Sequence, residues 1–180
     1  MNQSSLVGRR DFIAGGTVVT VAAALSPISP ALAATAAGSK TAVIAVPGDL
    51  DWFATLPGEE VAIHIPGDRV GGQFAIMESI AAPGAGAPPH IHLGADECFF
   101  IQEGQMHFMC DGVEFDASAG SSVVVPRGAA HSWVNLTDKP VRSLVSFTPG
   151  GIEQMFTKLA AAFPAGIEAL AAEYDTVLVQ

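Results

Sequence analysis

The stretch GAGAPPHIHLGADECFF, residues 84–100, places two histidines and a glutamate among small and apolar residues. His90 and His92 are separated by one residue, and Glu97 follows after a short turn-like segment. Residues i and i+2 of a β-strand point to the same side, so the two imidazoles share a face. The stretch therefore predicts a strand that presents two imidazoles together, with a carboxylate where the next strand begins.

From residue 61 onward, short β-rich runs alternate with turn residues. Runs such as VAIHI at 61–65, ECFFI at 97–101 and VRSLVSF at 141–147 are bounded by Pro, Gly or Asp-Gly. Strands that follow one another at intervals of about 8 to 12 residues are typical of an all-β sandwich or barrel. Residues 152–163 and 166–174 instead carry apolar residues at three- and four-residue steps, so we expect two helices packed outside the β unit.

The segment around Gly104 predicts a hairpin with a two-residue turn at Glu103 and Gly104. In that register one face, which we expect to line the barrel interior, carries Glu97, Phe99, Ile101, Met106, Phe108 and Cys110. Cys98 and Cys110 would point to opposite faces. We therefore expect two free, buried thiols and no disulfide between them.

Two sets of spaced residues resemble the two sequence motifs of the cupin family. The first motif is matched by Gly84, His90, His92, Glu97 and Gly104. The second is matched by Gly120, Pro126, Gly128, His131 and Asn135. The resemblance implies an all-β fold, a small jelly-roll β-barrel with the C-terminal helices packed outside. It also implies that a divalent metal is held by His90, His92, Glu97 and His131.

The chemistry of the residues agrees with that metal site. Three imidazoles and one carboxylate suit Fe, Mn, Ni, Cu or Zn, and they leave coordination positions open for water, substrate or oxygen. Burying four titratable groups without a cation would be costly. We therefore predict one divalent transition metal, whose identity the sequence leaves open.

Four large apolar residues are candidates for a substrate pocket: Phe99, Met106, Phe108 and Trp133. Small barrels fill their interiors with side chains, so these residues could equally be core. Those nearest the metal would form an apolar wall suited to a flat organic molecule.

A looser likeness concerns activity. The segments RVGGQFAIMES at 69–79 and FTPGGIEQMF at 147–156 resemble quercetin 2,3-dioxygenase-like cupins. This implies a metal-dependent dioxygenase acting on a small aromatic or enolic substrate, with Glu97 also serving as a catalytic base. Two alternatives stay open: a non-catalytic periplasmic cupin that binds a metal or small ligand, and a metal-dependent sugar isomerase or epimerase. The apolar inward positions weaken the sugar alternative.

The first residues resemble a bacterial twin-arginine export signal. Arg9 and Arg10 precede an apolar run at 13–25 that is too short to span a bilayer, and Ala-Leu-Ala follows at 31–33. We expect cleavage near Ala33 and export to the periplasm or beyond. The expected divisions are a signal peptide at 1–33, an extended segment at 34–60, a cupin barrel at 61–148 and a helical segment at 149–180.

The formal net charge of −10, with no basic cluster beyond Arg9 and Arg10, argues against nucleic acid or an anionic membrane as partner. A small-molecule substrate is the expected partner. The resemblance also implies that a homodimer could form.

Overall fold

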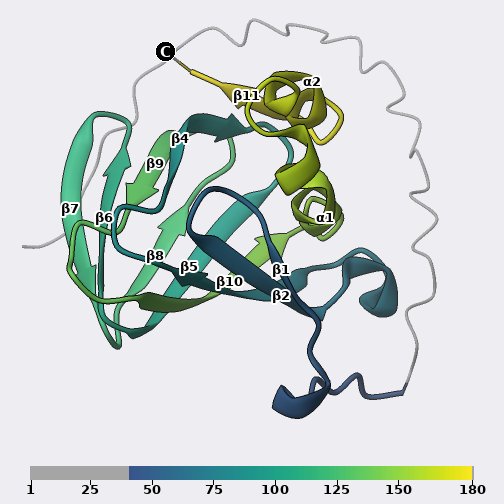
Figure 1. The fold of residues 1–180 in the computed structure, drawn as a ribbon. Helices are drawn as coiled ribbons and strands as arrows, with labels where there is room; N and C mark the ends of the chain where they lie inside the picture. Colours follow the sequence, from purple (N-terminus) through teal and green to yellow (C-terminus); the bar gives the residue numbers. More distant parts are fainter. Residues whose placement is uncertain (1–40, 180) are drawn as a thin grey trace, which may run out of the picture. The chain divides into compact units, whose positions relative to one another are not determined.

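The computed structural model describes residues 41–179 (Figure 1). The predicted signal peptide at 1–33 lies outside the described residues, so export stays a prediction. The strands are β1 (Trp52–Ala54), β2 (Glu59–Ile65), β3 (Ala75–Ala81), β4 (Gly86–His92), β5 (Asp96–Glu103), β6 (Gln105–Cys110), β7 (Val113–Ser118), β8 (Ser122–Val125), β9 (Ala130–Val134), β10 (Val141–Thr148) and β11 (Thr176–Leu178). The α-helices are α1 (Glu153–Ala162) and α2 (Ile167–Ala172), and two 3-10 turns are η1 (Pro47–Asp49) and η2 (Gly67–Val70).

The strands form two antiparallel sheets that together make a jelly roll. One sheet has the order β1-β2-β3-β10-β5-β8, and the other has the order β11-β4-β9-β6-β7. Alternating inward side chains of both sheets fill the space between them, as expected for a β-sandwich. The predicted all-β class and the two C-terminal helices are confirmed. Among the described residues, no helix is long and apolar enough to cross a membrane.

The predicted hairpin at Glu103 and Gly104 is wrong. β5 pairs with β10 and β8, whereas β6 pairs with β7 and β9, so the chain passes from one sheet to the other at this point. Gly104 has a φ of 83°, and a Cβ there would lie 3.0 Å from Val141 Cγ2. Sequence alternation cannot distinguish a hairpin from such a crossover, because the alternation of side chains within each strand is the same in both cases.

The expected inward face is nevertheless correct, because side-chain alternation within each strand does not depend on its partner. Phe99, Ile101, Met106 and Phe108 are all buried core residues. The rings of Phe99 and Phe108 meet edge to face with their centroids 5.1 Å apart, so β5 and β6 contact each other across the core. Cys98 and Cys110 are free as predicted, but both are half-buried rather than fully buried.

Both segments expected to flank the barrel contribute strands to its sheets. β1, from the N-terminal extended segment, pairs with β2, and β11, from the C-terminal segment, pairs with β4. Between β10 and β11 the chain forms α1 and α2, which lie together at one end of the sandwich (Figure 1). The buried Glu153 fixes the start of α1 by accepting hydrogen bonds from the amides of Gly67 at 2.9 Å and Gly151 at 2.5 Å.

Candidate metal centre

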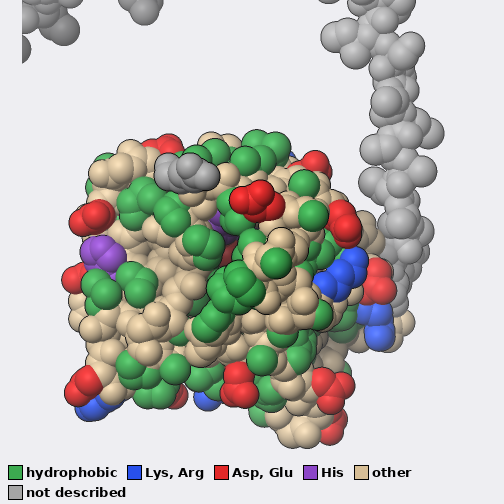
Figure 2. Space-filling model, turned by 45° about the horizontal axis from the view of Figure 1, so that its top comes forward, with side chains coloured by type: hydrophobic (Ala, Val, Ile, Leu, Met, Phe, Trp, Pro, Cys, Tyr) green, Lys and Arg blue, Asp and Glu red, His purple; other side chains and the backbone are tan. Residues whose placement is uncertain are grey.

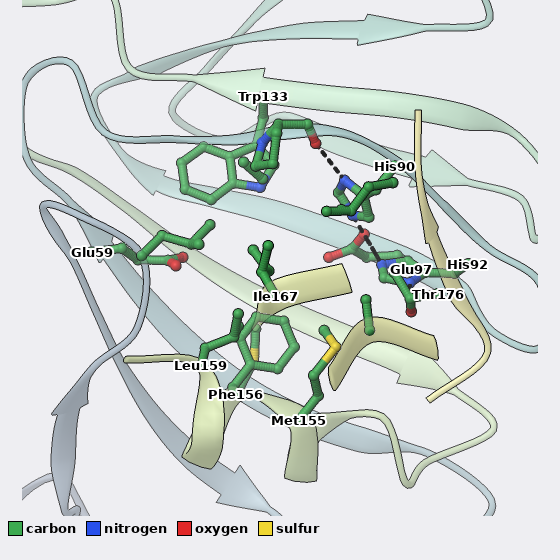
Figure 3. A pocket seen from close by; sticks show the side chains of 16 residues that line it. Glu59, His90, His92, Glu97, Trp133, Met155, Phe156, Leu159, Ile167 and Thr176 are labelled. Atoms are coloured by element: carbon green, nitrogen blue, oxygen red, sulfur yellow. Dashed lines mark hydrogen bonds and ion pairs between the residues drawn. The ribbon is translucent and has the colours of Figure 1, made fainter. Parts of the chain in front are cut away.

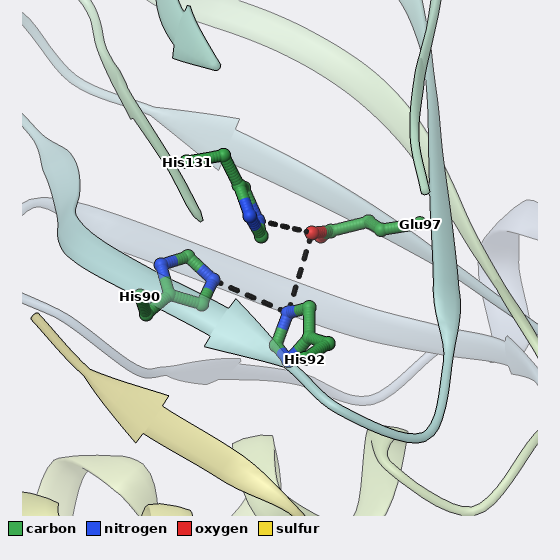
Figure 4. A group of neighbouring side chains, drawn as sticks. All are labelled: His90, His92, Glu97 and His131. Atoms are coloured by element: carbon green, nitrogen blue, oxygen red, sulfur yellow. Dashed lines mark hydrogen bonds and ion pairs between the residues drawn. The ribbon is translucent and has the colours of Figure 1, made fainter. Parts of the chain in front are cut away.

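The four candidate ligands meet at the end of the sandwich near α1 and α2 (Figure 4). His90 and His92 lie on β4, Glu97 is the second residue of β5, and His131 lies on β9. The register pairs His90 directly with His131, which brings their rings to a centroid distance of 4.1 Å. All four side chains are buried, and each offers one ligand atom within 4.8 Å of the others.

The separations between these atoms fit a single ion. Nε2 of His90 lies 3.2 Å from Nε2 of His92, and Oε2 of Glu97 lies 3.0 Å from Nε2 of His131 and 3.3 Å from Nε2 of His92. Ligand bonds of about 2.0–2.2 Å place neighbouring donor atoms about 3.0–3.5 Å apart. The four side chains can therefore hold one metal ion.

The other ring nitrogen of each histidine has its own partner. Nδ1 of His90 donates to the carbonyl oxygen of Pro88 at 2.8 Å, and Nδ1 of His131 lies 3.2 Å from that of Ala129. Nδ1 of His92 lies 2.9 Å from the hydroxyl of Thr176. With a metal bound, a proton on each Nδ1 would leave each Nε2 lone pair directed to the ion, and the Nδ1 partners would fix the rings, as is common for metal-binding histidines.

The pKa shifts differ among the candidate ligands. Burial acts to lower the pKa of His131, but the hydrogen bond with Glu97 and its negative charge outweigh burial and raise that pKa above its ordinary value. Burial is the main cause that lowers the pKa of His90 to about 4, so this imidazole is neutral near neutral pH. Burial also acts to raise the pKa of Glu97, but hydrogen bonds with His131 and His92 outweigh it and lower the pKa to about 2. Glu97 therefore stays ionised and supplies the negative charge that favours a cation.

Thr176 is a supporting residue that the sequence did not reveal. Its hydroxyl donates to the carbonyl oxygen of Tyr174 at 3.2 Å, which leaves its lone pairs free to accept the Nδ1 proton of His92. β11 brings Thr176 into register opposite His92. Most of the barrel sequence separates Thr176 from His92, and no motif spacing predicts the hydrogen bond between them.

Replacing Thr176 by valine should lower metal affinity by about 10- to 100-fold, because His92 loses the group that fixes its ring. Competition with a chromophoric chelator measures this affinity. Thr157→Val is the matched control, since the Thr157 hydroxyl bonds only to a carbonyl of its own exposed helix turn. Equal affinities for the two variants would mean that Thr176 does not orient His92.

A cavity opens beside the candidate ligands and is mostly apolar (Figure 3). His90, His92 and Glu97 form one part of its wall. The apolar part combines Trp133 of β9 with side chains of both helices, namely Met155, Phe156, Leu159, Ile167 and Ala171. Figure 2 looks onto this end of the molecule, where hydrophobic side chains surround a small hollow in which part of a histidine is visible.

The substrate-pocket candidates divide into one lining residue and three core residues. Trp133 lines the cavity, whereas Phe99, Met106 and Phe108 do not. They point inward as expected, but they lie further along their strands and pack against one another in the core. The helices close the end of the barrel and supply the apolar wall that we had assigned to these strands.

Sequence reasoning missed the helical part of the cavity. The apolar spacing in residues 152–163 and 166–174 predicted helices with a buried face, but not what that face covers. Glu59 was also missed, although it alternates with Val61 and Ile63 on an inward-facing stretch, which is a signal for a buried acid. The remaining histidines are outside the centre: His64 pairs with Glu78, and His107 pairs with Asp116.

The two sheets, the barrel end and the buried cluster of three histidines and one glutamate define a jelly-roll domain with a candidate metal centre. Residues 77–147, which include all four candidate ligands, match the family described as Cupin domain. The described fold is accordingly the cupin jelly roll.

Solved structures share this fold at low sequence identity. KdgF from a Halomonas species aligns with a TM-score of 0.58 and 20% identity, covering 63% of this chain and 99% of that protein. An RmlC-like cupin from Shewanella frigidimarina aligns at 0.55 with 17% identity, covering 63% of this chain and 96% of its own. A predicted oxalate decarboxylase from Thermotoga maritima aligns at 0.52 with 18% identity, covering 59% and 98%. No curated protein matches the chain.

Proposed function

We propose that this protein is a metal-dependent cupin enzyme that uses oxygen to transform a small enolic or aromatic molecule. The observation that carries the proposal is the wall of the cavity, in which three candidate metal ligands lie beside otherwise mainly apolar side chains. Polar ligands on one side of an apolar cavity bind a small organic molecule and fix its orientation.

A redox-active divalent metal, when bound, supplies a Lewis acid and a route for electrons to oxygen. The residues of the chain supply the rest of the site. Glu97 is a carboxylate within the cavity wall, and it can accept the acidic proton of an enol whose oxygen lies beside it. The apolar side chains of α1 and α2 keep bulk water away from reactive species.

The size of the cavity limits the substrate. Its volume is about 50 Å³. Sites for drug-sized ligands are much larger, at about 300–1,000 Å³. A molecule with few non-hydrogen atoms fits this space, whereas a flavonol is larger than the cavity. The compared structures carry names of different activities and share the fold alone, so the cavity is the better guide to substrate size.

Oxygen consumption tests this proposal. The protein is loaded separately with iron, manganese, nickel and copper and incubated with small enols first and flavonols second. We expect oxygen uptake with at least one metal, at a higher rate for the small compounds, and none with His131→Ala. No oxygen uptake with any metal and substrate would contradict the proposal.

A non-catalytic metal or ligand carrier is the second candidate. The observation in its favour is that two helices cover the cavity, which suits retention of a bound molecule as well as protection of a reaction. Tight, metal-dependent binding of an enol without turnover would identify a carrier. The same oxygen measurement, combined with recovery of the unchanged enol, separates the two functions.

A further inference from the structure

A second buried glutamate faces the cavity away from the histidine cluster. Glu59, at the start of β2, is 3% exposed and is one of the residues that line the cavity. Figure 3 shows its carboxyl group on one side and His90 with Glu97 on the other. The site thus contains two carboxyl groups, of which Glu97 belongs to the candidate ligand set and Glu59 does not.

The partners of Glu59 are hydroxyl groups. Thr55 Oγ1 donates to Glu59 Oε2 at 2.6 Å, and Ser79 Oγ donates to Glu59 Oε1 at 2.7 Å. Within residues 41–179, no ion pair involves this carboxyl. A buried carboxylate without a cationic partner is costly, so this environment favours the neutral acid.

The electrostatics point the same way. Burial raises the pKa of the Glu59 carboxyl above its ordinary value, and the negative charge of Glu97 raises it further, while the two hydroxyls offset only part of this effect.

We propose that Glu59 is a second ligand-contacting group of the cavity, which donates a hydrogen bond from its neutral carboxyl to an oxygen atom of a small anionic or enolic molecule held at the metal centre. This inference rests on the proposed small-molecule site. If the proton passes to the ligand, the O–H bond of Glu59 breaks and an O–H bond forms on the ligand. The hydroxyls of Thr55 and Ser79 are already placed to stabilise the carboxylate that remains.

The proposal predicts coupling between protonation and binding. The other titratable groups on the cavity wall are His90, His92 and Glu97, all in the candidate metal centre, and the facing parts of α1 and α2 are apolar. When Glu59 ionises at higher pH, it loses its donor and repels an anion in the same cavity. Anion affinity should therefore decrease as the pH rises and Glu59 ionises.

The test uses the whole protein loaded with cobalt(II), whose visible spectrum changes when an anion reaches the metal. The probes are acetate and the longer keto acid levulinate, titrated at several pH values. We expect the wild-type affinity for these anions to fall by at least about tenfold as the pH rises. A tenfold change corresponds to a difference of one unit between the pKa of Glu59 in the free and in the anion-bound protein. Glu59→Gln, which is always neutral and keeps a donor, should bind tightly at every pH. Glu59→Leu, which is neutral without a donor, should bind weakly at every pH.

Ser143→Ala is the matched control for Ser79→Ala, which removes a hydroxyl that donates to Glu59. Ser143 is buried and lies opposite Ser79 in the β3–β10 register, but its hydroxyl has no hydrogen-bond partner within residues 41–179. This variant should keep the wild-type pH dependence, whereas Ser79→Ala should shift it.

Three outcomes would overturn the role of Glu59. They are a pH dependence that persists in Glu59→Gln, equal affinities of Glu59→Gln and Glu59→Leu, and no spectral change with either probe in cobalt-loaded protein. Failure to hold cobalt at all would overturn the metal-dependent function itself, so the two failures are distinguishable.

Discussion

Replacing His131 by alanine should abolish stoichiometric metal binding. His131 is 0% exposed, and its Nε2 is one of the four donor atoms that converge on the centre. Its loss removes a ligand and also the hydrogen bond that helps to keep Glu97 ionised. Loss of a residue that only supports a metal ligand lowers metal affinity by about 10- to 100-fold. We expect the loss of His131 to lower it by more than that. Metal content after dialysis and calorimetric titration measure the effect.

His107→Ala is the control for this experiment. His107 lies on β6, is part of the exposed His107–Asp116 pair, and is not among the candidate ligands. It should bind metal as the wild type does. Retention of one tightly bound metal per chain by His131→Ala, with Glu97 and the other histidines intact, would contradict the proposed ligand set.

Replacing Phe147 by alanine should cause a large loss of stability. Phe147 is 0% exposed, and its ring lies 5.8 Å from that of His92 and 5.8 Å from that of Phe156, measured between centroids. It therefore packs against the metal centre and α1 at once. Truncation of a buried phenylalanine costs about 3–5 kcal/mol, which urea unfolding of the metal-free protein measures.

Phe100→Ala provides the comparison on the neighbouring strand. Phe100 points outward from β5 and is 42% exposed, so its replacement should change the free energy of unfolding by less than about 1 kcal/mol. Similar losses for the two variants would show that Phe147 does not have the buried position described. A selective loss in Phe147→Ala, accompanied by weaker metal binding, would support its contact with His92.

Much of the candidate metal site could be predicted from local sequence. Alternation places His90 and His92 on one side of β4 whatever the strand pairs with, and the spacing of the cupin motifs adds Glu97 and His131. The same alternation placed Phe99 and Phe108 inward. It failed at Gly104, because the direction of the chain after a tight turn depends on which sheet offers a free edge and not on the side chains of the turn.

The cavity could not be predicted in the same way. Its wall joins Glu59 of β2, Trp133 of β9 and Phe156 of α1, which are far apart in the sequence. The amphipathic pattern of α1 shows that one face is buried but carries no information about the surface that buries it. Thr176 is equally distant from His92, and the hydrogen bond between them exists only because β11 pairs with β4.

The sequence by itself determined the β-rich class and the inward faces of the strands, because these follow from side-chain alternation, and the resemblance to the cupin motifs implied the identity of the four candidate ligands. The tertiary structure decided the crossover between the sheets, the closure of the barrel end by α1 and α2, and the presence of a second acid across the cavity from the ligands. These features depend on contacts between distant segments, whose free energy is set by the shape and burial of both partners and is not encoded in either segment alone.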